Sequence, residues 1–123
     1  MSAEPTRLKR SDWASHPTLW KGVFEGKDIG TGMTVIFYTT EETGVGPKWH
    51  VHDYDEVFII TEGRALFTVG TQKLEVEAGD IVFGPANIPH KYHNLGPGRL
   101  QSTDIHLSPE WAQTDLDDPE LES

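Results

Sequence analysis

The chain has 123 residues, with 20 acidic and 10 basic side chains and a formal net charge of −10. This length fits a single domain with its own hydrophobic core, and the negative charge opposes binding to nucleic acid or anionic membranes. The absence of cysteine excludes thiolate chemistry, iron–sulfur clusters and thiolate zinc sites.

The N-terminal segment is polar and mixed in charge, and no apolar run in the chain is long enough for a membrane span. The first residues also lack the pattern of a signal peptide. We therefore expect a cytoplasmic protein with no nucleic-acid and no membrane partner.

Residues 1–20 lack the alternation of a strand and contain Pro5 and Pro17, yet they include Trp13 and Trp20. Disordered segments are usually poor in aromatic residues. We therefore expect an N-terminal arm that packs on the following domain or on a neighbouring subunit. The alternative is a frayed tail whose tryptophans are incidental.

From Lys21 onward, short segments rich in Val, Ile, Phe, Tyr and Thr alternate with Gly, Pro and Asp turns, which is typical of β-strands. Gly70 and Thr71 predict a tight hairpin. No segment has helical periodicity, apart from a possible turn over residues 109–113. We expect one all-β sandwich or barrel domain over residues 21–110. The predicted strands span residues 21–26, 32–39, 46–52, 56–61, 64–69, 72–77, 80–83, 88–93 and 99–107.

The C-terminal segment, residues 111–123, is rich in acidic side chains. Its last nine residues, DLDDPELES, carry five acids and no base. Chain ends of this composition are commonly solvated. We expect an acidic tail without a functional role.

Metal-ligating residue types cluster between Gly44 and Gly63. His50 and His52 are one residue apart, so on a strand both imidazoles point to the same face in chelating geometry. Glu56 has the same parity but follows a turn-like Asp-Tyr-Asp segment. We expect Glu56 to return on the neighbouring strand with its carboxylate on the same side.

A second stretch, GDIVFGPANIPHKYHN, supplies a third histidine, His90. Together the two stretches resemble the two signature motifs of the cupin superfamily. Asn87 stands where the second motif has a glycine, and because asparagine tolerates positive φ we expect the turn to be preserved. The first motif is matched at Gly44, His50, His52, Glu56 and Gly63, and the second at Gly79, Pro85, His90 and Asn94.

The resemblance implies a conserved jelly-roll barrel over residues 30–107 that binds one divalent metal inside, through His50, His52, Glu56 and His90. Three imidazoles and one carboxylate suit Mn, Fe, Co, Ni, Cu or Zn, and they leave one or two positions open on an octahedral ion. Open positions indicate substrate, water or dioxygen as further ligands. The alternative is a degenerate barrel whose histidines only form hydrogen bonds.

Parity also predicts the surroundings of the metal. If Glu56 points inward, so do Phe58 and Ile60, which gives a largely apolar pocket. We name three candidate catalytic residues: Tyr92, Asp104 and His106. The alternatives are core packing for Tyr92 and exposed or structural roles for Asp104 and His106.

The first functional hypothesis is a small metalloenzyme acting on an organic compound, either dioxygenase-like or a lyase, decarboxylase or isomerase. The second is a non-catalytic module that binds a sugar or organic acid with the metal as anchor. A storage-like structural role is the third. An open barrel of this size leaves edge strands to cover, so we expect a homodimer. Its interface candidates are Trp13, Trp20, Val23, Phe24 and Trp49.

Overall fold

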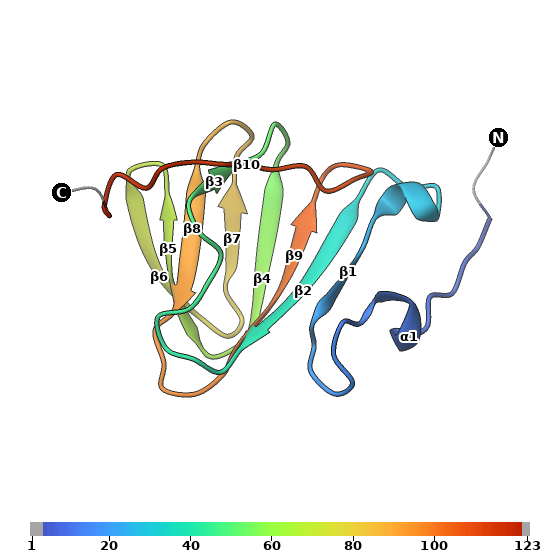
Figure 1. Ribbon diagram of the computed structural model, residues 1–123, viewed down its shortest axis with the longest axis horizontal. Coiled ribbons are helices and arrows are strands. Elements are labelled where there is room, and N and C mark those ends of the chain that lie inside the picture. Colours follow the sequence, from blue (N-terminus) through green and yellow to red (C-terminus); the bar gives the residue numbers. More distant parts are fainter. Residues whose placement is uncertain (1–3, 122–123) are drawn as a thin grey trace.

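The computed structural model describes residues 4–121 and consists mainly of two antiparallel sheets that face each other as a jelly roll (Figure 1). This confirms the expected all-β fold. In spatial order the first sheet contains β1 (Gly22–Phe24), β2 (Thr34–Thr40), β9 (Leu100–His106), β4 (Glu56–Glu62) and β7 (Ile81–Gly84). The second contains β10 (Thr114–Asp115), β3 (His50–Val51), β8 (His90–Asn94), β5 (Arg64–Val69) and β6 (Gln72–Glu77).

All nine strands expected from the sequence are present, with ends shifted by a few residues. The structure adds three short elements that the sequence pattern did not predict: β10, the single-turn helix α1 (Arg10–Trp13) and the 3₁₀ helix η1 (Gly26–Asp28). Elements of two to four residues are too short to show a period. Within residues 4–121 no helix has the length and apolarity needed to cross a bilayer.

The pairing of β3 and β4 differs from our expectation. The sequence predicts Glu56 on the strand next to that of His50, but β3 pairs with β8 and β10, whereas β4 pairs with β7 and β9. The turn at residues 53–55 carries the chain from one sheet to the other. Glu56 therefore approaches His50 from the opposite wall of the barrel.

The interior of the barrel divides into two halves. The closed half is mainly apolar and is filled by Phe58, Ile60, Phe67 and other buried residues. The mouth half lies at the end formed by the β3–β4 turn and the β7–β8 loop, and its buried side chains are polar or ionisable (Figure 1). They include His50, His52, Glu56, His90, Asp104 and His106.

The N-terminal arm packs on the outer face of the first sheet. The ring centroids of Trp13 and Trp20 lie 4.2 and 4.7 Å from that of Phe37. Trp20 also donates a hydrogen bond from Nε1 to Thr103 Oγ1 at 3.1 Å. The described part of the arm therefore lies against the barrel, in agreement with the first expectation for this segment.

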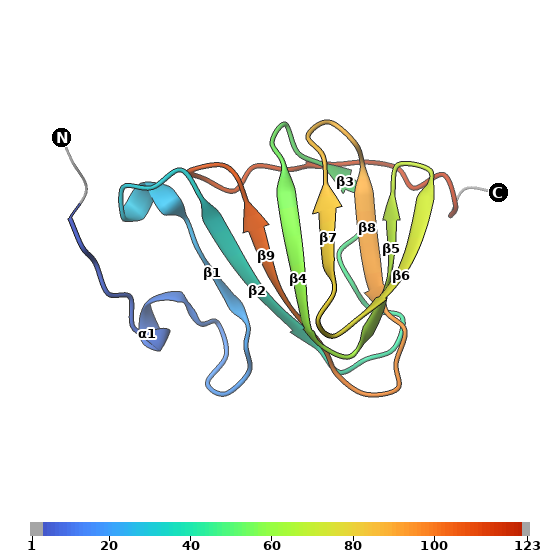
Figure 2. The same cartoon turned by 180° about the vertical axis from the view of Figure 1, so that it is seen from behind.

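The chain after β9 crosses the mouth of the barrel, as both Figure 1 and Figure 2 show. We call residues 111–118 the strap. Most of its residues are exposed, but β10 pairs with β3 and the Leu116 N–H donates to the Trp49 carbonyl at 3.1 Å. Asp118 forms an ion pair with Lys91 at 2.5 Å. The strap is therefore attached to the barrel, although its composition alone is that of a solvated chain end.

Two turns agree with their sequence patterns. Val69 and Gln72 pair directly, so Gly70 and Thr71 form the two-residue hairpin. Asn87 has a φ of 67°, which confirms that it replaces glycine in a left-handed conformation. Its N–H donates to the His52 carbonyl at 2.8 Å, so this turn also supports the segment that carries a candidate ligand.

Candidate metal centre

Four buried side chains converge in the mouth half of the barrel. His50, His52, Glu56 and His90 are each at most 5% exposed, and each offers a ligand atom within 4.8 Å of the others. His50 and His90 face each other directly across the β3–β8 pair. The four residues that the sequence predicted as ligands are thus brought together.

Hydrogen bonds leave one ring nitrogen free on two of the histidines. His50 Nδ1 bonds the Lys48 carbonyl, and His52 Nδ1 bonds the Ala112 carbonyl at 2.7 Å. A carbonyl only accepts, so both Nδ1 atoms carry the proton. When these imidazoles are neutral, their Nε2 atoms are unprotonated and available as metal ligands.

The free atoms of the cluster aim at a common point. His52 Nε2 and His90 Nε2 each lie 3.2 Å from Glu56 Oε1, yet none of these three atoms forms a hydrogen bond within the described chain. Burying such atoms without a partner is costly. A divalent cation would satisfy all three, so this donor set fits a transition metal.

The electrostatics favour the protonation states that metal binding requires at His50 and Glu56, whereas they favour the protonated form of His52. Burial and the neighbouring imidazoles lower the pKa of His50 to about 4, so it is neutral at pH 7. Burial opposes ionisation of Glu56, but the three adjacent imidazoles, of His106, His52 and His90, outweigh it and lower its pKa far below the usual range. For His52, burial is outweighed by the Glu56 carboxylate, which raises its pKa. A bound cation would compete with that proton.

His106 lies inside the barrel and contacts the cluster. Its Nε2 lies 3.0 Å from Glu56 Oε2, and its Nδ1 lies 2.6 Å from the hydroxyl of Tyr54. Burial raises the pKa of Tyr54 to about 12, so the phenol keeps its proton. Tyr54 was missed from the sequence because its neighbours, Asp53 and Asp55, indicate only a turn.

Tyr92 and Asp104 form a buried pair beside the cluster. The Tyr92 hydroxyl donates to Asp104 Oδ2 at 2.7 Å, while Asp104 Oδ1 has no hydrogen-bond partner among the described residues. Burial, together with the negative charge of Glu56, raises the pKa of Asp104 to about 8. The Tyr92 ring also stacks on Phe67 at 4.4 Å, so it belongs to the core as well as to the site.

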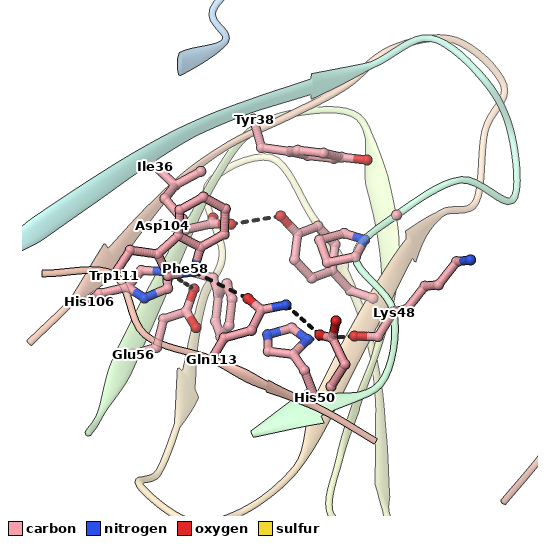
Figure 3. Close-up of a pocket in the computed structure, with 14 residues that line it drawn as sticks. Ile36, Tyr38, Lys48, His50, Glu56, Phe58, Asp104, His106, Trp111 and Gln113 are labelled. Atoms are coloured by element: carbon pink, nitrogen blue, oxygen red, sulfur yellow. Dashed lines mark hydrogen bonds and ion pairs between the residues drawn. The ribbon is translucent and has the colours of Figure 1, made fainter. Parts of the chain in front are cut away.

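A cavity of about 480 Å³ opens next to these residues (Figure 3). Its walls combine the apolar Ile36, Tyr38 and Phe58 with the ionisable His50, Glu56, Asp104 and His106. Figure 3 shows Trp111 and Gln113 of the strap on the same cavity. Ile60, which we expected in the pocket, lies deeper in the apolar core.

The family model for the cupin domain matches residues 30–106, which is more than half of the chain. The chain is a cupin. Asn94, the last position of its second motif, lies far from the metal cluster. Its amide donates to the Gly98 carbonyl and accepts from the Gly96 N–H, both at 2.8 Å, so it fixes the loop at the closed end.

Among curated proteins, this cupin is similar to an uncharacterised protein of Methanocaldococcus jannaschii, with 32% identity over 84 residues (66% of this chain, 58% of the relative). An uncharacterised protein of Streptomyces coelicolor is 41% identical over 63 residues (51% and 59%). The acireductone dioxygenase of Geobacillus kaustophilus is 30% identical over 66 residues (49% and 37%). The cupin therefore matches less than two thirds of the length of these relatives.

Solved structures share the fold. The oxalate decarboxylase of Bacillus subtilis, studied for its Mn(II) centres, has a TM-score of 0.71 at 20% identity, covering 77% of this cupin and 27% of that chain. A conserved protein of unknown function from Streptococcus pyogenes has a TM-score of 0.58 at 20% identity, covering 66% and 68%. At these identities the likeness concerns the fold alone.

Proposed function

We propose that this cupin is a metalloenzyme that holds one divalent transition metal per chain and acts on a small organic substrate. The observation that carries the proposal is the position of the cluster. His50 and Glu56 line a cavity that also contains Asp104, an acid with a free oxygen. A purely structural metal site would not need an adjacent cavity of substrate size.

The chain's own groups suit acid–base work on a bound molecule. The metal, when bound, would supply a Lewis acid or a redox centre for the substrate. Asp104 lines the cavity and would exchange a proton with a substrate oxygen, since its pKa of about 8 lies near neutrality. Tyr92 would hold Oδ2 of Asp104 in place. His106 lines the same cavity and would orient Glu56.

Two of the similar proteins support a proposal for the reaction class. One similar protein is an acireductone dioxygenase and one similar fold is an oxalate decarboxylase. We accordingly propose oxygen-dependent cleavage or decarboxylation of a small enol or organic acid, with Mn, Fe, Ni, Co, Cu or Zn as the metal. The ligand set itself accepts all six ions.

Metal content tests the site directly. Protein purified without chelators or an immobilised-metal column should contain about one transition-metal ion per chain by elemental mass spectrometry. His90→Ala should lose most of it. His93→Ala is the matched control, because His93 is on the same strand but has the opposite parity and is outside the cluster. Equal metal content in wild type and His90→Ala would contradict the ligand assignment.

Turnover tests the enzyme. Metal-loaded protein should consume oxygen or release CO₂ with at least one member of a panel of enols, diketones and organic acids. Asp104→Asn should keep the metal and lose most of the rate, typically by 10²-fold or more for a lost acid–base group. Absence of turnover with every metal and substrate class would count against the enzyme.

The alternative function is a non-catalytic module that binds a sugar or organic acid through the metal. The strap favours this alternative, because Trp111 and Gln113 cover part of the cavity and would retain a ligand. Saturable binding of a panel compound by calorimetry, without any product by mass spectrometry, would support it over the enzyme.

A homodimer remains a prediction. Trp13, Trp20 and Phe24 are partly engaged with Phe37 in the same chain, which leaves less of the arm for an interface. The edge strand β7 instead exposes Phe83, which is 55% accessible. Light scattering at micromolar concentration should give twice the mass of one chain, and a monomeric mass would reject the dimer. Cytoplasmic location also remains a prediction.

A further inference from the structure

The strap contacts the metal cluster although it lies outside residues 30–106, which the cupin-domain family model matches. The carbonyl of Ala112 accepts the hydrogen bond of His52 Nδ1 at 2.7 Å. This bond sets the rotation of the imidazole and selects the tautomer whose Nε2 is free. One ligand is therefore oriented by a residue from the far end of the chain.

A second connection runs from the strap to Glu56. The Tyr54 hydroxyl lies 3.0 Å from the Ala112 carbonyl and 3.4 Å from its N–H. The same hydroxyl lies 2.6 Å from His106 Nδ1, and His106 Nε2 lies 3.0 Å from Glu56 Oε2. With the Nε2 proton of His106 directed at the carboxylate, Nδ1 accepts the phenol proton, and the hydroxyl oxygen of Tyr54 accepts the hydrogen bond of the Ala112 N–H.

Tyr54 also contacts His52 through its ring. The two ring planes are stacked at a centroid distance of 4.7 Å and an angle of 20°. Tyr54 therefore touches one ligand with its ring and reaches another, Glu56, through His106. Among the contacts described above, Tyr54 is the side chain that connects the strap to both His52 and Glu56.

The barrel holds the strap at both ends, which is necessary if the strap is to fix a ligand. Before Ala112, the Trp111 N–H donates to Glu25 Oε2 at 2.9 Å. After it, the Leu116 N–H donates to the Trp49 carbonyl at 3.1 Å, and Asp118 pairs with Lys91. The Ala112 carbonyl consequently has a defined position relative to the β3–β4 turn.

We propose that the strap and Tyr54 form a positioning network that holds His52 and Glu56 in the orientation required for metal binding. The inference rests on the metal site proposed above. Preorganised ligands lose less conformational freedom when the ion binds, and outer partners of metal ligands are typically worth about 10- to 100-fold in affinity. Residues 111–118 therefore belong to the metal site, and Ala112 is the residue whose main chain contacts His52.

Tyr54→Phe tests the network, since it removes the hydroxyl and keeps the ring on His52. We expect the dissociation constant for Co(II) to rise by about tenfold or more, and the visible absorption bands of bound Co(II) to shift. The matched control is Tyr38→Phe, which removes a phenol that lines the cavity and has no hydrogen bond to the cluster. Its Co(II) affinity and spectrum should equal those of wild type.

Leu116→Pro tests the strap independently, because proline removes the N–H that bonds Trp49. Co(II) affinity should again fall by about tenfold or more, while far-ultraviolet circular dichroism of the metal-free barrel remains that of wild type. Wild-type affinity and spectrum in both Tyr54→Phe and Leu116→Pro would overturn the positioning network alone. Failure of the wild-type protein to bind Co(II) at all would instead overturn the metal site and this inference with it.

Discussion

The closed half and the mouth half of the barrel are built from the same strands but differ in chemistry. On β4, the inward side chains change from Glu56 at the mouth to Phe58 and Ile60 below, and all three are at most 2% exposed. On β9 they change from His106 at the mouth to Leu100. Burial alone therefore does not distinguish structural from functional residues in this barrel. What differs is that several buried polar atoms of the mouth half, on His52, Glu56, His90 and Asp104, have no hydrogen-bond partner among the described residues.

This difference assigns stability to the closed half and ligand binding to the mouth half. Apolar groups gain free energy by leaving water, whereas the orphaned nitrogens and oxygens of the mouth half cost free energy until a ligand satisfies them. The closed half should therefore stabilise the metal-free protein, and the mouth half should destabilise it. Each prediction below probes one side of this contrast.

The largest effect is expected in the closed half. Phe67→Ala should lower the free energy of unfolding by about 3–5 kcal/mol, because the ring is fully buried and its removal leaves a cavity. Phe83→Ala on the exposed face of β7 is the control and should cost much less. Urea unfolding measures both. Equal losses would mean that the interior does not dominate stability.

Metal binding should stabilise the mouth half. At a free metal concentration 100 times the dissociation constant, the free energy of unfolding should rise by about 2.7 kcal/mol, and EDTA should reverse the change. Thermal unfolding with and without metal checks this. His90→Ala should show no metal-dependent shift, and an unchanged shift in that variant would place the ion elsewhere.

The pH dependence of stability should reveal Asp104. In the folded protein its pKa is about 8, against a usual value of 3.8, so the folded state binds more protons than the unfolded state between these values. Stability of the metal-free protein should therefore fall as pH rises through this window, by up to about 1.4 kcal/mol per pH unit from this group. Stability is measured by urea unfolding at each pH.

Asp104→Asn isolates this contribution, because the neutral amide does not titrate. His50 acts in the opposite direction, since its pKa is lowered from 6.5 to about 4 and its contribution rises with pH only inside that interval. The difference between wild type and Asp104→Asn should therefore be compared between pH 6.5 and 8. Parallel curves there would show that Asp104 is ionised throughout.

The smallest effect is expected at the rim. Asn87→Ala should cost about 1 kcal/mol, because alanine is strained at a φ of 67°, whereas Asn87→Gly should be nearly neutral. Urea unfolding of the two variants provides the comparison. A larger loss for glycine than for alanine would mean that the amide side chain, rather than the backbone conformation, matters at this turn.

The barrel and the four ligands could be predicted because their information is local. Strand alternation, turn residues and the fixed spacing of His50, His52, Glu56 and His90 all follow from short segments of sequence. For Asp104 and His106, the sequence predicted a shared face of one strand but not whether that face points into the barrel. The choice depends on how the two sheets pack, which parity within one strand does not encode.

Neither the position of the strap nor the sheet to which β4 belongs could be predicted, and the physical reason is a different one. A turn at residues 53–55 serves equally for a hairpin within one sheet and for a crossing between sheets. The strap has no periodicity, and its acidic composition is that of a solvated end. Its contact with His52 is made by the carbonyl of Ala112, which every residue type possesses, so no side-chain pattern could indicate it.

That carbonyl has a consequence for how the site can vary. The main chain supplies the bond to His52, so many side chains could replace alanine at position 112 without losing the acceptor. A change in the number of residues between β9 and β10 would, by contrast, move the acceptor away from the imidazole. The strap should thus tolerate substitutions but not insertions or deletions. The length of this segment, rather than its side chains, would be the feature that the metal site requires.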